Sequence, residues 1–246
     1  MISRDNCFGI TDKGICRTNN QDSFVIEEKD GCLLGVVCDG IGGGRAGDVA
    51  SAMAAEIMAE QFREFFEPDQ NWQQWLLDTV NLANISVYQK SIEDDECAGM
   101  GTTLVAFIAD GSRTLVVNVG DSRCYQLKEG GMEQVSEDHT LVNEMVKYRG
   151  FDYEFACQLV GRNVISRAIG VNEVVEGDCF EPDNYQYLLL CSDGLHGYVE
   201  EESIRDCLYD EETDLPQKAE KLVELANEAG GWDNTTVVIL KGDANG

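Results

Sequence analysis

Five short segments of the chain contain an aspartate among small or polar residues, and most of these aspartates adjoin an apolar run. They are Asp22, Asp39, Asp121, Asp193 and Asp233. Carboxylates at the ends of neighbouring buried strands can converge, and a cluster of them is costly unless a cation neutralises it. Carboxylate and carbonyl oxygens are the ligands that Mg²⁺ and Mn²⁺ prefer. The pattern therefore predicts a site for hard divalent ions.

Two of the aspartates end an apolar run and precede a glycine, in Asp39-Gly40 and Asp193-Gly194. Glycine allows a tight turn there, and its carbonyl oxygen can also face a metal ion. An Asp-Gly pair alone is common in ordinary turns. Because Asp233 stands next to a third apolar run, three unrelated turn aspartates are the weaker interpretation.

Two divalent ions bridged by one carboxylate can hold a hydroxide that attacks a phosphoryl group. This chemistry needs no side-chain nucleophile, and the sequence offers little for one. It contains two histidines, no GxSxG motif, and no Lys-Ser/Thr after the glycine cluster 40–47. A guanidinium near the ions could clamp phosphate oxygens. For Arg17, however, spacing alone favours an exposed arginine paired with a nearby acid.

The composition narrows the class of protein. The 246 residues include 18 basic and 46 acidic side chains, a net charge of −28. Such a surface repels phosphate backbones, which excludes a general nucleic-acid binder; solubility is the plainest explanation of the charge. The ten cysteines form no CxxC pair, and no apolar run suits a signal peptide or a membrane span. We expect a soluble cytoplasmic protein, with a disulfide-bonded secreted protein as the poorer alternative.

Apolar periodicity and turn residues predict the elements. Strands are expected at 8–11, 23–28, 32–38, 102–109, 114–119, 122–127, 174–180, 185–191 and 235–240, and helices at 46–66, 72–92, 141–148, 152–160, 201–209 and 215–229. The strands at 174–180 and 185–191 are expected to form a pair. This order indicates an antiparallel α+β fold in a single domain, 1–246, with two sheets covered by helix pairs.

Eight motifs now identify a family that the chain resembles. They are Arg17-Thr18-Asn19-Asn20-Gln21-Asp22, Val37-Cys38-Asp39-Gly40-Ile41-Gly42-Gly43, Gly101-Thr102-Thr103, Asn118-Val119-Gly120-Asp121-Ser122-Arg123, Asp138-His139-Thr140, Ser166-Arg167-Ala168-Ile169-Gly170, Cys191-Ser192-Asp193-Gly194-Leu195 and Asp233-Asn234-Thr235-Thr236. In this order, from Gly9 to Leu240, the chain resembles a bacterial single-domain member of the metal-dependent protein serine/threonine phosphatases of type 2C.

The resemblance implies a four-layer αββα sandwich, in which two antiparallel β-sheets are flanked by antiparallel helix pairs. It also implies an enzyme, a phosphoprotein phosphatase. Such an enzyme hydrolyses phosphoserine and phosphothreonine on proteins, by attack of a hydroxide bridging two Mn²⁺ or Mg²⁺ ions. Expected partners are phosphorylated proteins, by default kinases of the Hanks type and their targets, with a role in signalling. Neither nucleic acid nor membrane is expected as a partner, and a monomer is expected.

The resemblance also implies roles for individual residues. Asp39 would bridge the two ions, with the Gly40 carbonyl on one of them, while Asp193 and Asp233 would hold the other. These three aspartates are the expected catalytic residues. Asp22 would act largely through metal-bound water.

Three further residues receive roles by the same resemblance. Asp121 would hold a third, weaker metal site shared with Asp193. Arg17 would be the phosphate-clamping arginine, which now outweighs the plain surface interpretation. Asn234 would orient Asp233 or a coordinated water. Gly101-Thr102-Thr103 is expected to pack beneath the site.

One position departs from the pattern. Some family members carry a histidine after the Asp-Gly turn as a proton donor, where this chain has Ile41. A metal-bound water is expected as the donor instead. His139 is a lesser candidate, because Asp138-His139-Thr140 is expected to cap the helix that starts near 141.

Residues 140–170 correspond to the family's variable flap beside the active site. Its basic residues are expected to receive phosphorylated or acidic segments, and they are Lys147, Arg149, Arg162 and Arg167. Arg45 and Asp48 are expected at the rim of the site. Two alternatives stay open at this point: a phosphatase-like sensor without turnover, and a simple Ca²⁺-binding acidic protein, although the EF-hand pattern is absent.

Overall fold

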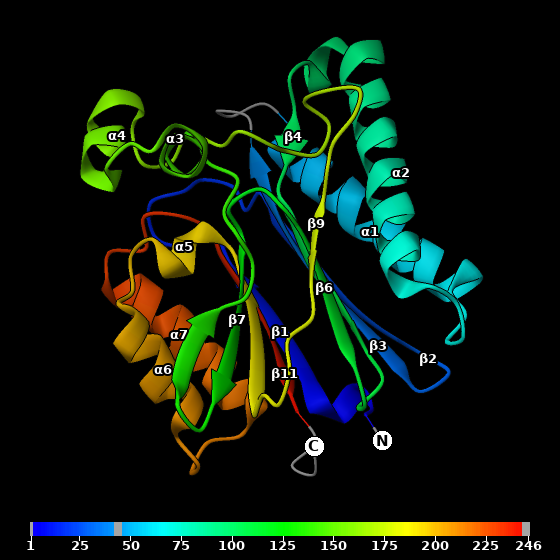
Figure 1. The fold of residues 1–246 in the computed structure, drawn as a ribbon, viewed down its shortest axis with the longest axis vertical. Coiled ribbons are helices and arrows are strands. Elements are labelled where there is room, and N and C mark those ends of the chain that lie inside the picture. Colours follow the sequence, from blue (N-terminus) through cyan, green and yellow to red (C-terminus); the bar gives the residue numbers. More distant parts are fainter. Residues whose placement is uncertain (1, 42–45, 243–246) are drawn as a thin grey trace.

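Two antiparallel sheets lie face to face at the centre of the molecule, and helices cover their outer faces (Figure 1). The computed structural model describes residues 2–41 and 46–242. The first sheet has the strand order β1-β11-β10-β7-β8, and the second has the order β2-β3-β5-β6-β9, with β4 paired to β3. The predicted α+β class and the four-layer sandwich are confirmed.

Each sheet combines strands from distant parts of the chain. The first consists of β1 (Cys7–Asp12), β7 (Arg123–Lys128), β8 (Gly131–Gln134), β10 (Tyr187–Cys191) and β11 (Thr235–Lys241). The second consists of β2 (Asp22–Lys29), β3 (Cys32–Ile41), β4 (Gly101–Thr102), β5 (Leu104–Ala109), β6 (Thr114–Val119) and β9 (Asp178–Phe180). The first and last of these strands along the chain, β1 and β11, are neighbours in register.

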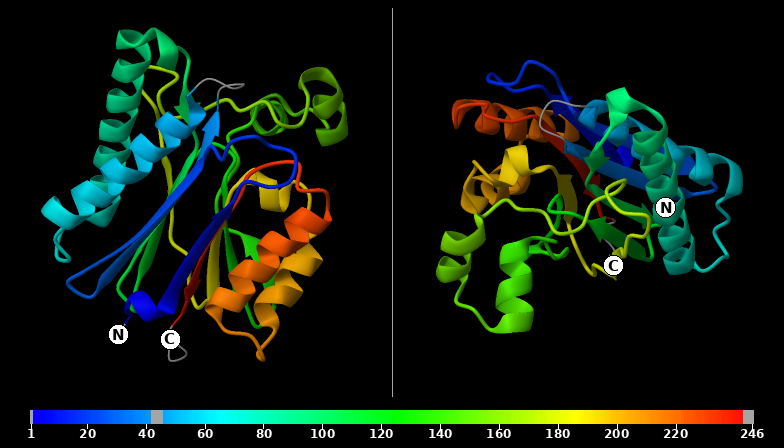
Figure 2. Two further views of the ribbon diagram at one scale, coloured as in Figure 1. Left: turned by 180° about the vertical axis from the view of Figure 1, so that it is seen from behind. Right: turned by 90° about the horizontal axis from the view of Figure 1, so that it is seen from above.

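Helices form the two outer layers, as seen from behind and from above in Figure 2. The second sheet is covered by α1 (Gly47–Phe65) and α2 (Trp72–Glu93), and the first by α5 (Asp193–His196), α6 (Glu201–Tyr209) and α7 (Leu215–Glu228). Short 3-10 helices occur at Arg4–Asn6 and Asp95–Cys97.

Three buried clusters hold the layers together. One lies between α1, α2 and the second sheet, another between α6, α7 and the first sheet, and a third between the two sheets. Strand β3 contributes to two of them, because successive side chains of a strand point to opposite faces and Leu33 through Cys38 are buried on both. This explains why 32–38 reads as a continuous apolar run rather than an alternating one.

The predicted pairing of 174–180 with 185–191 is wrong. Strand β9 is shorter than expected and forms the edge of the second sheet against β6, whereas β10 lies between β7 and β11 in the first sheet. Leu188 to Cys191 are fully buried, but all three residues of β9 are only partly buried. A buried apolar strand is stabilised more as a central strand than beside a short polar edge, so the chain crosses between the sheets here.

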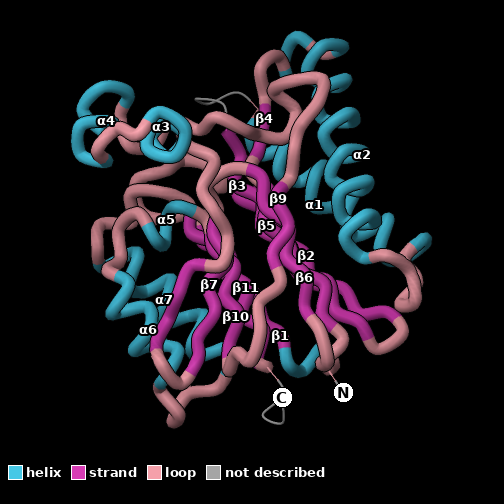
Figure 3. Tube along the Cα trace, in the orientation of Figure 1, coloured by secondary structure: helices cyan, strands magenta, loops and turns pink. Residues whose placement is uncertain are grey.

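Two more helices stand apart from these layers, at the upper left of Figures 1 and 3. They are α3 (Leu141–Arg149) and α4 (Tyr153–Val160), within the predicted flap. Thr140 and Asp152 cap their N-termini by accepting hydrogen bonds from the Asn143 and Phe155 amides. Few of their side chains are buried, since each helix contributes a single fully buried residue.

Candidate metal centre

The predicted acids lie at strand ends that meet at one end of the sandwich, near the end of β3 and the start of α5 (Figure 1). Asp39 lies near the end of β3, directly opposite Asp22 at the start of β2. Asp193 follows β10 and begins α5, and Asp233 precedes β11. Asp121 lies in the turn between β6 and β7. Because β10 and β11 belong to one sheet and β2 and β3 to the other, the site is built across the sandwich.

The backbone of Asp39 is held on both sides by the Thr102-Thr103 segment. Its amide donates to Thr103 Oγ1 at 2.9 Å, and its carbonyl accepts from the Thr103 amide at 2.8 Å and from Thr102 Oγ1 at 2.9 Å. Thr103 Oγ1 also lies 2.6 Å from the Ser122 hydroxyl. The Thr102-Thr103 pair therefore fixes the Asp39 peptide and links it to the turn of Asp121.

One oxygen of Asp22 is saturated and the other is not. Oδ2 accepts hydrogen bonds from Ser192 Oγ and Thr236 Oγ1, both at 2.7 Å, whereas Oδ1 is buried without a partner. The side chain is 7% exposed. The pKa of this carboxyl is raised to about 7. Burial and the charges of Asp193 and Asp233 raise it, whereas the hydrogen bonds from Thr236 and Ser192 lower it in part.

Sequence reasoning missed Ser192 and Thr236 as residues of the site. Both belong to motifs noted for their acids, Ser192-Asp193 and Asp233-Asn234-Thr235-Thr236. The serine directly before Asp193 could have been noted as a possible hydrogen-bond donor. The acid that accepts its hydrogen bond, Asp22, is far away along the chain.

Asp39 is electrostatically coupled to all four other acids. Burial raises the pKa of its carboxyl well above the ordinary range, and the charges of Asp22, Asp193, Asp121 and Asp233 add to the rise. The pKa of Asp193 is also raised by burial and by Asp233, and is lowered in part by a hydrogen bond with Asp39.

Asp233 is paired with the predicted phosphate-binding arginine. Arg17 Nη2 lies 2.6 Å from Asp233 Oδ2, and about half of the arginine side chain is exposed. The Asn234 amide donates to Asp233 Oδ1 at 2.8 Å. The Arg17 guanidinium is therefore at the site, in contact with one of its acids.

The side chain of Asn234 holds the loop that carries Arg17. It accepts from the Gln21 amide and donates to the carbonyls of Lys13 and Asn19, at 2.8–2.9 Å. The contact of Asn234 with Asp233 comes from its backbone amide.

Gly40 lies where its chain approaches two other backbones. A Cβ at this position would be 2.3 Å from the Gly47 carbonyl oxygen at the start of α1 and 2.6 Å from that of Gln21. The Gly40 amide donates to the Gln21 carbonyl at 3.0 Å. Only glycine allows this approach, which brings α1 and the start of β2 against the Asp39 turn.

The turn of Asp121 presents a buried carboxylate without a complete set of partners. Asp121 is 6% exposed, and its Oδ1 has no hydrogen-bond partner. Burial raises the pKa of this carboxyl to about 7, and the charges of Asp193 and Asp138 contribute. Asp193 is therefore close enough to act on both Asp39 and Asp121.

These residues fit divalent cations. Within 2–41 and 46–242, no three acidic, histidine or cysteine side chains enclose one point closely enough to bind an ion unaided. The two orphaned oxygens and the raised pKa values nevertheless show carboxylates that lack counter-charge. Cations, together with water ligands and the Gly40 carbonyl, would supply that charge.

The other predicted residues that the structure describes are in ion pairs or exposed. Three of the four basic flap residues are in ion pairs, Lys147 with Glu137, Arg162 with Glu154 and Arg167 with Asp178. Arg149 is exposed in the last turn of α3, and Asp48 is exposed in the first turn of α1. Arg45 lies outside the described residues.

His139 is not free to act as a proton donor. Its Nδ1 accepts from the Gly120 amide at 3.1 Å, and its Nε2 contacts Asp178 Oδ2 at 2.9 Å. Burial lowers the pKa of this histidine. Thr140 Oγ1 provides the cap of α3 that was predicted for this motif.

A central sandwich with a carboxylate cluster and an arginine at one end is the arrangement of a metal-dependent phosphatase. The family model described as protein phosphatase 2C matches residues 16–230. The chain therefore belongs to the protein phosphatase 2C family of serine/threonine phosphatases, and it is an enzyme, a phosphoprotein phosphatase.

Named relatives match along nearly their whole length. The chain is 38% identical over 238 residues to serine/threonine phosphatase stp of Listeria monocytogenes serotype 4b, covering 95% of this chain and 94% of the relative. It is 32% identical over 237 residues to protein phosphatase PhpP of Streptococcus pneumoniae serotype 2, covering 94% and 95%. The crystal structure of serine/threonine phosphatase Stp1 from Staphylococcus aureus superposes with a TM-score of 0.90 at 31% identity, covering 98% of this chain and 96% of that one.

None of the helices formed by the described residues is both long enough and apolar enough to cross a membrane.

Proposed function

We propose that the chain removes phosphate from phosphoserine and phosphothreonine on proteins, with two divalent ions held among Asp39, Asp193 and Asp233. The observation that supports this most directly is that five aspartates lie at neighbouring strand ends, Asp22 directly opposite Asp39, and that two of their buried oxygens have no hydrogen-bond partner. Such a cluster is stabilised by cations of the Mn²⁺ or Mg²⁺ type.

In this proposal, the family resemblance gives each ion its residues. Asp39 would bridge the ions, with the Gly40 carbonyl on one and with Asp193 and Asp233 on the other. Asp22 would contribute mainly through water, since its Oδ2 already accepts two hydrogen bonds. Asp121 and Asp193 would share a third ion. When bound, the ions supply a hydroxide nucleophile near neutral pH and neutralise charge on the phosphoryl group.

The protein's own residues hold and orient the reacting groups. Arg17 would leave Asp233 and clamp two phosphate oxygens with its planar guanidinium. Thr102 and Thr103 hold the Asp39 peptide, and Ser192 and Thr236 hold the Asp22 carboxylate. This fixed arrangement avoids reorganisation of the acids during the reaction. Because His139 is fully bonded, water near the acids is the proton donor in this proposal.

We also infer a single catalytic domain, 1–246, with residues 140–170 as a flap. The flap helices share this end of the sandwich with the acids, as expected of a segment that selects substrate (Figure 3). A signalling role, kinases of the Hanks type as partners, a cytoplasmic setting and a monomeric state stay predictions.

The test combines two acid variants with a matched surface control. Asp39→Asn and Asp193→Asn should each lower kcat on p-nitrophenyl phosphate and on a phosphothreonine peptide by about 10²-fold or more, because each loses a ligand and a charge. Chelation should abolish activity, and Mn²⁺ should restore it. Asp206→Asn, an exposed aspartate paired with Arg205 on α6, should match the wild type.

Calorimetric titration with Mn²⁺ gives a second readout that does not depend on turnover. The wild type should bind at least two ions, and Asp39→Asn should lose tight binding. Undiminished turnover in either acid variant, or activity that survives chelation, would refute the assignment.

A further inference from the structure

The two histidines of the chain both contact the same turn. His139 Nδ1 accepts a hydrogen bond from the Gly120 amide at 3.1 Å, and His196 Nε2 lies 3.0 Å from the Asp121 carbonyl oxygen, to which it donates. The Gly120 carbonyl in turn accepts from the His139 amide at 2.9 Å and from Asn118 Nδ2 at 3.1 Å. The peptide groups on both sides of Asp121 are therefore fixed by buried polar partners.

The carboxylate carried by this turn lacks a corresponding partner. Asp121 Oδ1 is buried without a hydrogen bond, and the side chain is 6% exposed. Gly120, just before it, has φ +106°, and a Cβ there would lie 2.7 Å from Thr103 Cγ2. A turn whose carbonyls are held by buried hydrogen bonds, and which carries a buried carboxylate oxygen without a partner, is suited to present that oxygen to a ligand.

The contacts of His139 with Gly120 and Asp178 favour one tautomer, although Arg167 Nη1 also lies 3.3 Å from Nε2. Because the Gly120 amide donates to Nδ1, that nitrogen carries no proton, and the ring proton is on Nε2. Nε2 then donates to Asp178 Oδ2 at 2.9 Å. Asp178 thereby keeps Nδ1 available as an acceptor, in the way that a carboxylate behind a histidine fixes its tautomer in other sites.

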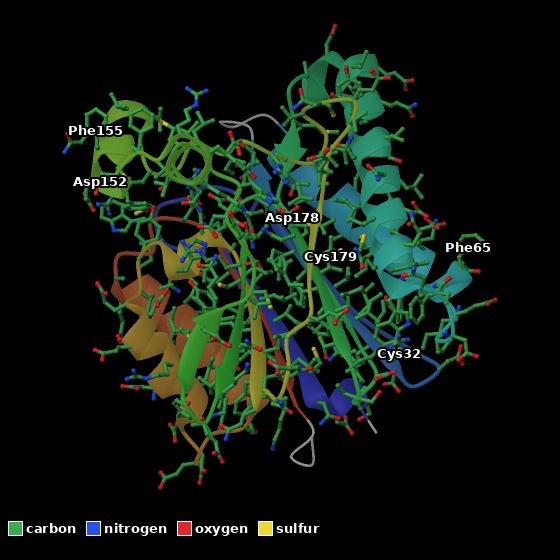
Figure 4. All side chains as sticks on the ribbon, in the orientation of Figure 1. Cys32, Phe65, Asp152, Phe155, Asp178 and Cys179 are labelled. Carbon is green, nitrogen blue, oxygen red and sulfur yellow. The ribbon has the colours of Figure 1, made fainter. Side chains whose placement is uncertain are left out.

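Asp178 and Arg167 connect the same histidine to the base of the flap. Asp178, labelled in Figure 4, lies on β9, and Arg167 Nη1 is 3.4 Å from its Oδ2. The His139 carbonyl accepts from the Ser166 amide at 2.8 Å, and Thr140 forms a β-bridge with Ile165. The two ends of the flap therefore meet at His139.

We propose that His139 is a positioning residue whose Nδ1 holds the Gly120–Asp121 turn in the orientation that presents the Asp121 carboxylate to a divalent cation. This inference rests on the proposed function, in which Asp121 and Asp193 share the third, weaker ion. His139 does not touch substrate or ion. It acts through its hydrogen bond with the Gly120 amide. Through Asp178 and Arg167, the same side chain also contacts the base of the flap.

Two substitutions separate the functions of the two ring nitrogens. In His139→Asn, the amide oxygen can occupy the place of Nδ1 and accept from Gly120, but the contact with Asp178 is lost. In His139→Gln, the longer amide reaches the place of Nε2 and keeps Asp178, but Gly120 loses its acceptor. A purely structural role would make the two variants similar.

The readout is Mn²⁺ titration by calorimetry, with melting temperatures measured on the same samples. His139→Gln should weaken binding at the weakest site by about 10-fold, the value of one buried hydrogen bond, and leave the tight sites unchanged. His139→Asn should stay within about 3-fold of the wild type at all sites. The activity of His139→Gln should recover at high Mn²⁺, with kcat near that of the wild type.

A third variant keeps the inference testable if His139→Gln fails to fold. Asp178 is 40% exposed, so Asp178→Asn should be tolerated. Asparagine lacks the negative charge that favours the proton on Nε2, so a larger share of the molecules carry it on Nδ1, where it opposes the Gly120 amide. Asp178→Asn should therefore weaken the same site, whereas Glu176→Gln, a neighbouring exposed acid, should not.

Equal weakening in His139→Asn and His139→Gln, or an unchanged weakest site in both His139→Gln and Asp178→Asn, would overturn the inference. A wild type that binds no Mn²⁺ would instead refute the proposed function itself. The two failures are therefore distinguishable in a single titration series.

Discussion

The Asp22 carboxylate and the Ser192 hydroxyl are 2.7 Å apart, although 170 positions separate them in the chain. Asp22 begins β2 in one sheet, and Ser192 follows β10 in the other. Thr236, at the start of β11, donates to the same carboxylate oxygen. These hydrogen bonds cross between the sheets, so the acid end of the sandwich forms only when both sheets are packed together.

Ser192→Ala removes one donor from a buried carboxylate. Hydrogen bonds to the ionised form lower a pKa, so the Asp22 pKa, about 7 in the metal-free protein, should rise further. Protons then compete with cations for the Asp22 carboxylate up to a higher pH. The acidic limb of the pH profile of Mn²⁺ affinity should move upward by about 0.5–1 pH unit, and stability should fall by about 1–2 kcal/mol.

The control for this variant is Ser86→Ala, which removes a hydroxyl that bonds to a helix carbonyl on the exposed face of α2. It should leave the pH profile unchanged. An acidic limb that stays in place in Ser192→Ala would show that Ser192 does not stabilise the ionised Asp22.

The metal-free protein should lose stability from Asp22 as the pH rises. The folded-state pKa of this carboxyl is about 7 and its ordinary value is 3.8, so the folded state holds a proton that the unfolded chain releases. This contribution is fully present below pH ~4 and is lost as the pH rises through 7. Between pH 6 and pH 8, the loss amounts to about 1.4 kcal/mol.

Comparison with Asp22→Asn measures the contribution of Asp22 together with its effect on the pKa of Asp39. The histidines act in the opposite direction, because burial lowers the pKa values of His139 and His196 and their stabilisation is lost as the pH falls. Both proteins share that effect. The change in Tm from pH 6 to pH 8, measured in chelator, should therefore be more negative in the wild type than in Asp22→Asn by about 3–5 °C. Identical pH dependence in the two proteins would contradict a raised Asp22 pKa.

Several parts of this fold could be predicted from the sequence because their signals are local. Helix α6 has the predicted bounds, since its apolar residues repeat at helical spacing, and strand β3 was evident as an apolar run. Strand β8 was missed because Gly131–Gln134 is short, polar and partly exposed, and pairs only at the edge of its sheet. Helix α5 was missed because it is a single turn after Ser192.

The residues of the candidate site also fall into two groups, those with a local signal in the sequence and those without one. The acids could be picked out because most of them adjoin an apolar run in the sequence. The hydroxyls on Asp22 and the bond of His139 to Gly120 could not, because each depends on tertiary contacts between elements far apart in the chain. The resemblance to a family supplied the acids and Arg17, but not their hydrogen-bond partners.

Arg17→Ala should mainly affect binding of the phosphate group. The guanidinium contacts Asp233 and is half exposed, so it is placed to bind phosphate without holding the fold together. KM should rise by about 10-fold while kcat stays within about 3-fold, because a ground-state clamp is lost. Arg17→Lys should be intermediate, since it keeps the charge but not the planar fork.

Steady-state kinetics on a phosphothreonine peptide and on p-nitrophenyl phosphate would check this. Arg205→Ala, which removes an exposed arginine paired with Asp206 on α6, serves as the control and should behave as wild type. A fall in kcat with unchanged KM would assign Arg17 to the transition state instead.

Gly40→Ala should disrupt the site through the backbone. The new Cβ would lie 2.3 Å from the Gly47 carbonyl and 2.6 Å from the Gln21 carbonyl, and neither backbone can move without displacing α1 or β2. Overpacking of this kind costs about 1–3 kcal/mol. Activity should fall by a larger factor than the loss of folded protein accounts for. The displaced backbone at Gln21 and Gly40 adjoins two acids of the site, Asp22 and Asp39. Thermal melts and kcat would be measured beside Gly130→Ala, where no heavy atom lies within 4 Å of the added Cβ. A Gly40→Ala protein that melts and turns over like Gly130→Ala would show that the close approach of these three segments is not required.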